Sequence, residues 1–292
     1  MKTIVRAAAG LVLACGLTAL GADKKIVLIG GGPSHGPGDH EHRAGCMLLQ
    51  RCLNQMPGVR AEVHQVWPDQ FEAFDGAAAV FIFSDGGGGH PAIQEDRLEQ
   101  LRRVMARGTG LGCMHYAVEV PKEKGGPEWL AWIGGYFETY WSVNPFWTAD
   151  FKELPVHPIT RGVKPFQLRD EWYYHMRFAE GMKGVTPILT AVPPESTRGK
   201  PGVNLPHGGN PHVQARKGMP EHLMWAFERP DGGRGFGCTG GHSHVEWGEE
   251  NFRKVILNAI LWSARIEVPE QGADCPVTPE ILKENLDRKG RR

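Results

Sequence analysis

The stretch that most constrains the fold of this chain is Ala77–Phe83, because all seven of its residues are apolar. A strand without polar positions fits the centre of a parallel sheet that is covered on both faces. Other strands are expected at 25–30, 59–66, 110–114, 222–228 and 235–239, and amphipathic helices at 43–56, 93–107 and 249–264. Strands that alternate with helices predict an α/β protein with a doubly wound, mostly parallel sheet.

The 292 residues are enough for one large domain with a core of its own. We expect an α/β domain at 23–265, interrupted between 116 and 191 by an aromatic-rich insertion with antiparallel strands. Residues 195–218 hold several Pro and Gly clusters and should form a long surface loop. Residues 266–292 lack a clear apolar face and are expected to be a loosely held tail.

Residues 1–22 have the pattern of a secretory signal peptide, in which Lys2 and Arg6 precede an apolar stretch at 7–20 and a small-residue exit. This stretch is shorter than the about 20 residues that span a bilayer, and no later segment has the composition of a membrane span. The sequence therefore predicts a periplasmic or secreted protein. Lipid attachment at Cys15, which ends a loose lipobox, is the less favoured alternative.

The charge balance gives no reason to expect a nucleic-acid partner. The chain has 33 basic and 33 acidic side chains, and removal of residues 1–22 leaves 31 and 33. A polyanion partner would call for a clear excess of basic residues.

Five cysteines remain after residue 22, which is an odd number for an oxidising compartment. At least one thiol therefore stays unpaired within the chain. Cys46 and Cys52 lie six residues apart on a predicted helix, so they should point in different directions and not form a disulfide. Cys113 and Cys238 lie at the ends of predicted strands and are expected to be buried, inert thiols.

Histidines follow the ends of several predicted strands. His35, His40 and His42 share one Gly/Pro-rich loop after the strand at 25–30, and others follow the strands at 77–83, 110–114 and 235–239. Ligands of open α/β sheets bind outside the carboxyl ends of the strands, where these imidazoles should meet. Neutral imidazole is a common ligand of zinc, so we expect a site for one divalent transition metal, with zinc as the first choice. The ligands are sought among seven histidines: His35, His40, His42, His90, His115, His242 and His244.

Nucleotide binding is the rival interpretation of the glycine runs at 30–32 and 86–89, since the N–H groups of such loops can hold phosphate. Neither run matches the phosphate-loop pattern. The dinucleotide pattern fits only if one glycine is misplaced. We therefore do not expect a nucleotide.

Aromatic residues concentrate between 129 and 174. Half or more of them should be core, and the remainder could stack on the C–H faces of a sugar. We therefore consider a carbohydrate ligand, with substrate contacts sought at Tyr140, Trp141, Trp172 and Asp85. In the segment 169–174, Glu171 is the candidate general acid/base and Tyr174 the candidate hydrogen-bond donor to substrate. The alternative for Glu171 is a solvated strand end.

Several segments, in their order along the chain, resemble the ThuA-like, or trehalose-utilisation, family. They are the apolar strand that ends at Gly30, the segment 110–117 with a histidine at a sharp turn, Gly134–Phe137, His157–Gly162, Asp170–Tyr173 and the segment 235–242 before a last helix with Trp262. The resemblance covers roughly 25–264. It implies a fold similar to that of class I glutamine amidotransferases, which is of the flavodoxin-like type.

The resemblance also has implications for function. In amidotransferases the sharp turn carries a nucleophilic cysteine and a later strand end carries its histidine. Here the two positions match His115 and His242, which argues against glutamine hydrolysis. The resemblance implies the handling of sugars, such as keto-sugars made by partner dehydrogenases.

Three hypotheses remain. The first is a secreted enzyme that uses a metal ion to hydrolyse, eliminate from or isomerise a keto-sugar or glycoside, with His115, Glu171, His242 and Tyr174 in catalytic roles. The second is a carbohydrate-binding protein without chemistry. The third is a hydrolase whose nucleophile is Cys113, two residues before the turn.

Overall fold

The computed structural model describes residues 23–203 and 205–290, so the predicted signal peptide, with Cys15, lies outside the described residues. The helices are α1 (His42–Leu53), α2 (Arg97–Met105), α3 (Gly126–Trp132), α4 (Pro211–Gln214) and α5 (Glu250–Ser263). The strands are β1 (Lys24–Gly30), β2 (Val59–Gln65), β3 (Ala77–Phe83), β4 (Gly110–Met114), β5 (Gly135–Tyr136), β6 (Trp147–Phe151), β7 (Phe166–Asp170), β8 (Arg177–Phe178), β9 (Val185–Ala191), β10 (Glu221–Glu228) and β11 (Arg234–Cys238). Over the described ranges, we find no helix with the length and apolar character needed to cross a bilayer.

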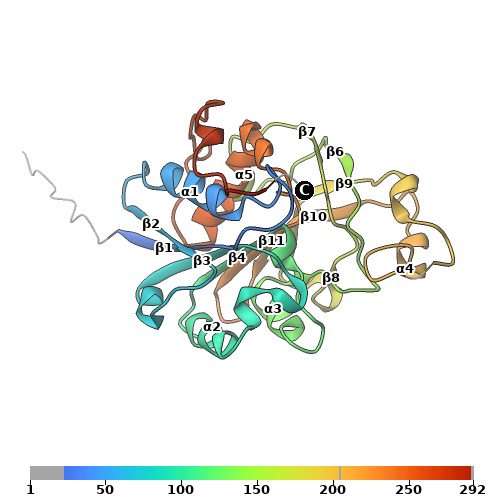
Figure 1. Cartoon of the computed structure of the whole chain (residues 1–292), viewed down its shortest axis with the longest axis horizontal. Helices are drawn as coiled ribbons and strands as arrows, with labels where there is room; N and C mark the ends of the chain where they lie inside the picture. The colour runs from blue at the N-terminus through green and yellow to red at the C-terminus, as the bar shows by residue number, and fades with distance from the viewer. Residues whose placement is uncertain (1–22, 204, 291–292) are drawn as a thin grey trace, which may run out of the picture.

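The central sheet has seven strands in the order β2-β1-β3-β4-β11-β10-β9 (Figure 1). Strands β2, β1, β3, β4 and β11 are parallel, and β10 runs antiparallel to both of its neighbours. This arrangement confirms the predicted doubly wound, mostly parallel sheet. The six predicted strands agree with the observed ones to within one residue at each end.

Different helices cover the two faces of the sheet (Figure 1). Ile26 and Leu28 of β1 belong to a core that includes residues of α1 and α5, whereas Val27 and Ile29 belong to a core with residues of α2 and α3. Successive side chains of a strand point to opposite faces, so a strand between two helical layers is apolar at every position.

The parallel strands end in one row. Gly30 pairs with Phe83, Phe83 with Met114, and Met114 with Cys238, so the carboxyl ends of β1, β3, β4 and β11 lie side by side. The loops that follow these strands carry most of the histidines selected from the sequence. They therefore meet at one edge of the sheet.

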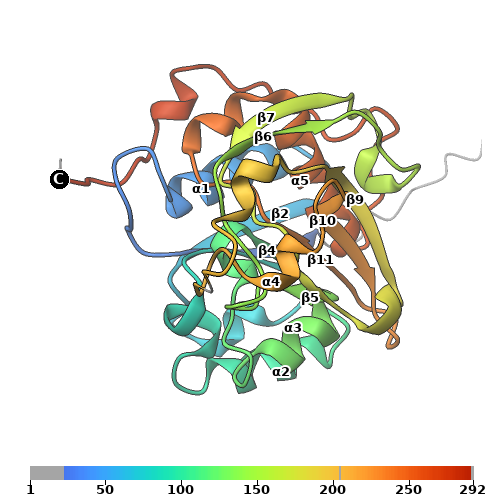
Figure 2. The same cartoon turned by 90° about the vertical axis from the view of Figure 1, so that its right-hand side faces the viewer.

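The insertion between 116 and 191 contains the expected antiparallel strands (Figure 2). β6 pairs with β7 and β5 with β8, while β9 joins the edge of the central sheet. The Trp172 ring lies 5.9 Å from that of Phe252 in α5, which fixes the end of β7 against this helix. Residues 195–218 form the expected long connection, and its described part includes the 3-10 turn Glu195–Arg198 and the short helix α4.

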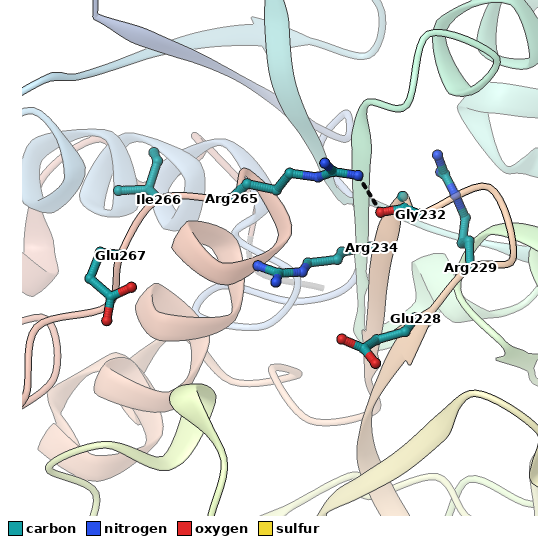
Figure 3. A pocket seen from close by; sticks show the side chains of 8 residues that line it. Glu228, Arg229, Gly232, Arg234, Arg265, Ile266 and Glu267 are labelled. Atoms are coloured by element: carbon teal, nitrogen blue, oxygen red, sulfur yellow. Dashed lines mark hydrogen bonds between the residues drawn. The ribbon is translucent and has the colours of Figure 1, made fainter.

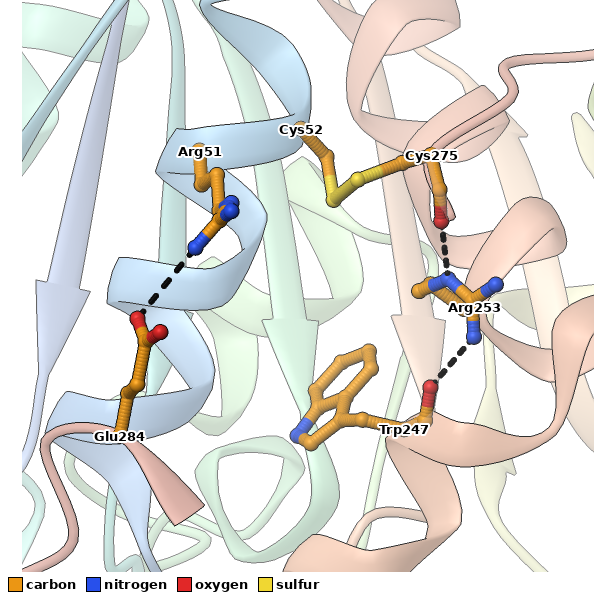
Figure 4. Close-up of a disulfide and its surroundings, with 6 residues drawn as sticks. All are labelled: Arg51, Cys52, Trp247, Arg253, Cys275 and Glu284. Atoms are coloured by element: carbon orange, nitrogen blue, oxygen red, sulfur yellow. Dashed lines mark hydrogen bonds and ion pairs between the residues drawn. A yellow bond between two sulfur atoms is a disulfide. The ribbon is translucent and has the colours of Figure 1, made fainter. Parts of the chain in front are cut away.

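A disulfide ties the C-terminal segment to the first helix. Cys275 is bonded to Cys52 of α1, and Arg253 of α5 donates a hydrogen bond to the Cys275 carbonyl at 3.0 Å (Figure 4). The expectation of a loosely held tail is therefore wrong. The pattern of the tail sequence does not reveal that Cys275 has a disulfide partner 223 residues away. The thiols that remain free in the described chain are all buried, and they are Cys46, Cys113 and Cys238.

The end of the tail also contacts the loop before α1. Lys289 forms an ion pair with Glu41 at 3.2 Å, and both side chains are almost fully buried. Lys289 also donates hydrogen bonds to the main-chain carbonyls of Asp39 and His40. The tail therefore supports the loop that carries the first histidines.

Candidate functional site

Three histidines and one glutamate meet at the carboxyl edge of the sheet. His40 lies in the β1–α1 loop, His115 follows β4, His242 lies in the loop after β11, and Glu171 follows β7. His40 Nε2 lies 3.1 Å from His115 Nε2 and 3.1 Å from His242 Nδ1. Glu171 Oε2 lies 3.1 Å from His242 Nδ1 and 3.6 Å from His115 Nε2. We call these four residues the histidine cluster.

Hydrogen bonds outside the histidine cluster indicate which ring nitrogens carry hydrogen. His115 Nδ1 lies 2.9 Å from the carbonyl oxygen of Thr239, which can only accept, so Nε2 has the unshared electron pair. His40 Nδ1 lies 2.7 Å from the Asp85 carboxylate, which favours the same tautomer. In these tautomers the two Nε2 atoms face each other as acceptors. A cation between them would turn this repulsion into attraction.

The distances within the histidine cluster fit a divalent transition metal. Zinc binds imidazole nitrogen at about 2.0–2.1 Å, which places the donor atoms of a tetrahedral site about 3.3 Å apart. Two pairs of cluster nitrogens are separated by 3.1 Å. Metal-binding imidazoles usually donate their other N–H to a carbonyl or carboxylate, as His115 and His40 do here.

The surroundings of the site shift the pKa values of three of its side chains in different directions. Burial and the neighbouring His40 lower the pKa of His115 well below its ordinary value, so this ring is neutral. Burial opposes protonation of His242, but its hydrogen bond to Glu171 and the charge of that carboxylate raise the pKa above the ordinary value. Burial disfavours ionised Asp85, but hydrogen bonding to His40 and the nearby imidazoles lower its pKa to about 2.

Two imidazoles of the histidine cluster stand on strained backbone. His40 has φ of +48° and His115 has φ of +54°, both in the left-handed region. Such a conformation costs of order 1–3 kcal/mol for a residue with a side chain, and it persists where the surrounding structure enforces it. His115 begins the 3-10 turn His115–Val118 directly after β4, which agrees with the sharp turn expected from the sequence.

Tyr173 faces the histidine cluster, and Tyr174 does not. The Tyr173 hydroxyl lies 3.1 Å from His115 Nε2 and donates to Glu171 Oε2 at 3.3 Å. Burial raises the pKa of Tyr173 well above its ordinary value, so the hydroxyl keeps its proton. The Tyr174 hydroxyl instead lies 3.0 Å from Thr197 Oγ1. Neighbours in an extended segment point to opposite sides, and the sequence does not say which one points inward.

Asp170 connects two segments of the site. Its buried carboxylate accepts hydrogen bonds from the main-chain N–H groups of Glu171 at 2.6 Å, His242 at 3.2 Å and Gly241. Burial and the charge of Asp170 raise the pKa of Glu246 to about 12, so Glu246 carries a proton beside Asp170. This buried pair fixes the main chain on which Glu171 and His242 stand.

His35, His42 and Asp85 lie beside the histidine cluster. The ring of His35 is exposed and lies 3.6 Å from that of His40, centroid to centroid. His42 is buried, with Nε2 3.8 Å from Asp85 Oδ1. Asp85, selected as a substrate contact, accepts hydrogen bonds from His40 and from Ser34 at 2.9 Å. Its place beneath His40 indicates that it orients this imidazole.

His90 and His244 lie apart from the histidine cluster. His90 is fully buried, with Nδ1 accepting from the Ala92 N–H at 3.1 Å and Nε2 lying 3.2 Å from the Ala117 carbonyl. This imidazole therefore holds two loops together. His244 is also buried but lines a different pocket, against the C-terminal tail.

Two of the aromatic residues selected as substrate contacts pack against other protein groups. Trp172 is fully buried and packs so closely under Gly240 that a Cβ there would lie 2.5 Å from the ring. Trp141 is stacked on His175 at 4.7 Å, and the Arg177 guanidinium lies 3.4 Å from its ring centroid. The Trp172 ring is therefore closed to a substrate, whereas the Trp141 ring is half-buried.

Two aromatic side chains of the insertion, Tyr140 and Phe146, are exposed. Tyr140 is 53% exposed and Phe146 is 44% exposed. The Phe146 ring lies 4.8 Å from that of His242, at the edge of the histidine cluster. Phe146 was recognised in the sequence as one of many aromatic residues but was not selected, since its exposure depends on the fold.

The structure gives little support to Cys113 as a nucleophile or to phosphate binding by the glycine runs. Cys113 is fully buried within β4, and burial raises the pKa of its thiol. Gly86 packs against the main chain of Tyr116, where a Cβ would lie 2.0 Å from the carbonyl oxygen. The glycine at this position is therefore explained by close packing.

A polar hollow of about 500 Å³ lies at the opposite end of the sheet, between the β10–β11 turn and the segment after α5 (Figure 3). Its arginine side chains already have partners. Arg229 donates to the Thr109 carbonyl and to Asp231, both at 3.0 Å, and Arg265 donates to the Gly232 carbonyl. The histidine cluster is the stronger candidate for a functional site.

The sheet, its helical layers and the cluster at its carboxyl edge define an α/β protein with a site in the usual position for this fold. The chain belongs to the ThuA family, described as trehalose utilisation, whose model matches residues 34–263. This confirms the resemblance seen in the sequence.

Solved structures support the same fold. A ThuA-like protein from Bacteroides uniformis ATCC 8492 is 14% identical, with 83% of this chain and 92% of that chain covered and a TM-score of 0.55. A ThuA-like protein from Parabacteroides merdae ATCC 43184 is 15% identical, with 83% and 90% covered and a TM-score of 0.50. At these identities the likeness concerns the fold alone. No curated protein matches the chain.

Proposed function

We propose that this protein is an exported, metal-assisted enzyme that hydrolyses, eliminates from or isomerises a keto-sugar or glycoside. The observation that carries the proposal is the convergence of three imidazole nitrogens and one carboxylate oxygen, all within 4.8 Å of one another. The family description, trehalose utilisation, supports a sugar as the substrate class. The upstream partner would be a dehydrogenase that supplies the keto-sugar.

His40, His115 and His242 would hold the ion, which we propose to be zinc. A zinc ion with three imidazole ligands and an open position polarises a carbonyl group or acidifies a bound water. The hydrogen bonds to Thr239 and Asp85 leave Nε2 of His115 and of His40 as the nitrogens that would face the ion. Because burial keeps His115 neutral, this ring would bind the ion without first losing a proton.

Glu171 and Tyr173 would handle protons and hydrogen bonds to the substrate. Glu171 lies at the edge of the ligand set and accepts a hydrogen bond from Asn144 at 3.2 Å, which orients the carboxylate as a general acid/base. Tyr173, which keeps its proton, would donate a hydrogen bond to a substrate oxygen. Phe146 and Tyr140 would offer exposed rings to the C–H faces of the sugar.

Export is supported by the apolar stretch at 7–20 and by the disulfide between Cys52 and Cys275. Disulfides persist mainly in oxidising compartments such as the periplasm.

The test is elemental analysis of tag-free protein together with turnover of a panel of keto-sugars and glycosides. We expect about one equivalent of zinc, retention of this metal in Glu171→Gln, and a loss of turnover of about 10²–10⁴-fold in that variant. Protein without stoichiometric metal that still turns over a sugar would overturn the metal proposal. Tight sugar binding without any product would identify a binding protein instead. Loss of zinc from Glu171→Gln would make Glu171 a ligand and remove it from the acid/base role.

A further inference from the structure

A second group of metal-binding side chains lies on the other side of the His40 ring. One donor atom each of His35, His40 and Asp85 lies within 4.8 Å of the other two. The histidine cluster uses His40 Nε2, whereas this second group contains His40 Nδ1, which lies 2.7 Å from Asp85 Oδ1. We call His35, His40, Asp85 and the neighbouring Ser34 the outer group.

Ser34 connects the members of the outer group. Its Oγ lies 3.0 Å from His35 Nδ1, 3.2 Å from His40 Nδ1 and 2.9 Å from Asp85 Oδ1. These separations are slightly shorter than the about 3.3 Å between donor atoms of a tetrahedral zinc site. Imidazole nitrogen and carboxylate oxygen are ligands that zinc accepts, and the hydroxyl oxygen completes the set in the place of a water.

The outer group is open to solvent. The His35 ring is exposed, and the Asp85 side chain is 37% exposed. His40, which the two groups share, is 1% exposed. An ion can therefore reach the outer group from solution through His35 and Asp85, and water can fill any ligand position that the protein leaves open.

His42 gives a separate indication of a positive charge beside Asp85. Its Nδ1 lies 3.4 Å from the Gly32 carbonyl, which can only accept, so in the neutral ring Nε2 has the unshared electron pair. This Nε2 is buried, has no hydrogen-bond partner within the described chain and lies 3.8 Å from Asp85 Oδ1, which is also an acceptor. Buried polar atoms are nearly always hydrogen-bonded, and an exception calls for an explanation. A cation bound to Asp85 would offset the repulsion between these two atoms.

We propose that the outer group binds a second divalent transition metal ion, such as zinc, so that the His40 imidazole bridges two ions. This inference rests on the proposed function, because the first ion is the one held by His40, His115 and His242. The second ion takes the place of the hydrogen between His40 Nδ1 and Asp85, and that proton passes to solvent. The two ions would lie about 6 Å apart, since each lies about 2.0–2.1 Å beyond its nitrogen of the ring. Because a proton must leave, the second ion binds more weakly, and the purified protein carries mainly the first.

The test is a calorimetric titration of zinc into metal-free protein. We expect two classes of site in the wild type, the second with a Kd at least about tenfold higher than the first. His35→Asn should lose the weaker class and keep the tighter one, since His35 belongs only to the outer group. Asparagine suits this position because it tolerates the φ of +58°. His212→Asn is the matched control, because His212 is exposed and belongs to neither group.

Asp85→Asn tests the outer group through a second ligand. This variant keeps the shape of the side chain but removes its charge. It should also lose the weaker class, and its tighter class should weaken by about 10–100-fold because Asp85 orients the His40 ring.

The outcomes separate the second ion from the first. A single class of site that His35→Asn leaves unchanged, or a weaker class that survives in both variants, would overturn the second ion and leave the proposed function intact. Loss of the tighter class in His35→Asn would place the main ion in the outer group and overturn the ligand set of the proposed function.

A further measurement tests whether the two ions share His40. Cu²⁺ also binds imidazole, and two Cu²⁺ ions joined by one imidazole couple magnetically. The electron paramagnetic resonance signal at two equivalents of Cu²⁺ should therefore be well below twice the signal at one equivalent. His35→Asn should not show this loss of signal. Two independent copper signals in the wild type would overturn the bridging position of His40.

Discussion

Replacing His115 by alanine should remove most of the stabilisation that zinc gives to the fold. His115 is fully buried and contributes one of three imidazole nitrogens, with Nε2 3.1 Å from His40 Nε2. Zinc sites with four protein ligands bind with about 10–16 kcal/mol, or about 2.5–4 kcal/mol for each ligand if shared equally. The loss of one ligand should therefore weaken binding by about two to three orders of magnitude.

Thermal unfolding converts this loss into a measurable shift. Zinc at 100 times its Kd stabilises the wild type by about 2.7 kcal/mol, which corresponds to an increase of about 5–10 °C in Tm for a domain of this size. At the same zinc concentration, the increase for His115→Ala should be less than about 2 °C. Differential scanning fluorimetry with and without zinc, after removal of metal by a chelator, measures both values.

His90→Ala is the matched control. His90 is equally buried and also follows a strand of the sheet, but its nitrogens bind the Ala92 N–H and the Ala117 carbonyl. This variant should start from a lower Tm and still show the full increase with zinc. A zinc-dependent increase in His115→Ala as large as that of the wild type would refute the assignment of His115 as a ligand.

Three further predictions concern proton transfer, pH and the tail. Tyr173→Phe should lower kcat by about 10–100-fold. Tyr174→Phe should leave kcat within about twofold of the wild type, because the Tyr174 hydroxyl lies against Thr197. Equal losses of kcat in the two variants, measured by steady-state kinetics, would contradict the assignment of Tyr173. Because Glu171 raises the pKa of His242 above its ordinary 6.5, zinc affinity should be complete above that raised pKa and fall by up to about tenfold per pH unit below it. A competition titration between pH 5 and 8 that shows no such fall would remove His242 from the ligand set. Cys275→Ser should lower the free energy of unfolding by about 2–5 kcal/mol in urea titrations, and an unchanged midpoint would show that the disulfide contributes little.

The sheet could be predicted because the residues of each strand show the strand's own pattern of apolar positions. Ala77–Phe83 is apolar at every position and has the bounds of β3, since a strand between two helical layers leaves no polar position. The alignment of strand ends at Gly30, Phe83 and Met114 then follows from parallel pairing. Histidines placed after such strands were therefore expected to meet, as His40, His115 and His242 do.

What the sequence could not give is the direction of individual side chains and the partners of distant ones. His90 follows β3 as His115 follows β4, but its ring turns into the core and bonds the Ala117 carbonyl. Tyr173 and Tyr174 differ only by one position, and the geometry of the segment after β7 decides which one faces the site. A one-residue change in an extended segment reverses the face to which a side chain points.

The disulfide between Cys52 and Cys275 also constrains the order of events during biosynthesis. Cys52 is made 223 residues before its partner, and the thiols of Cys113 and Cys238 are made in between. A thiolate attacks any disulfide or oxidised partner that it can reach, so these thiols compete while they are exposed. Formation of β4 and β11 buries both of them within the central sheet. If the sheet forms before oxidation, Cys113 and Cys238 are buried, and Cys52 and Cys275 can then pair without competition from these two thiols.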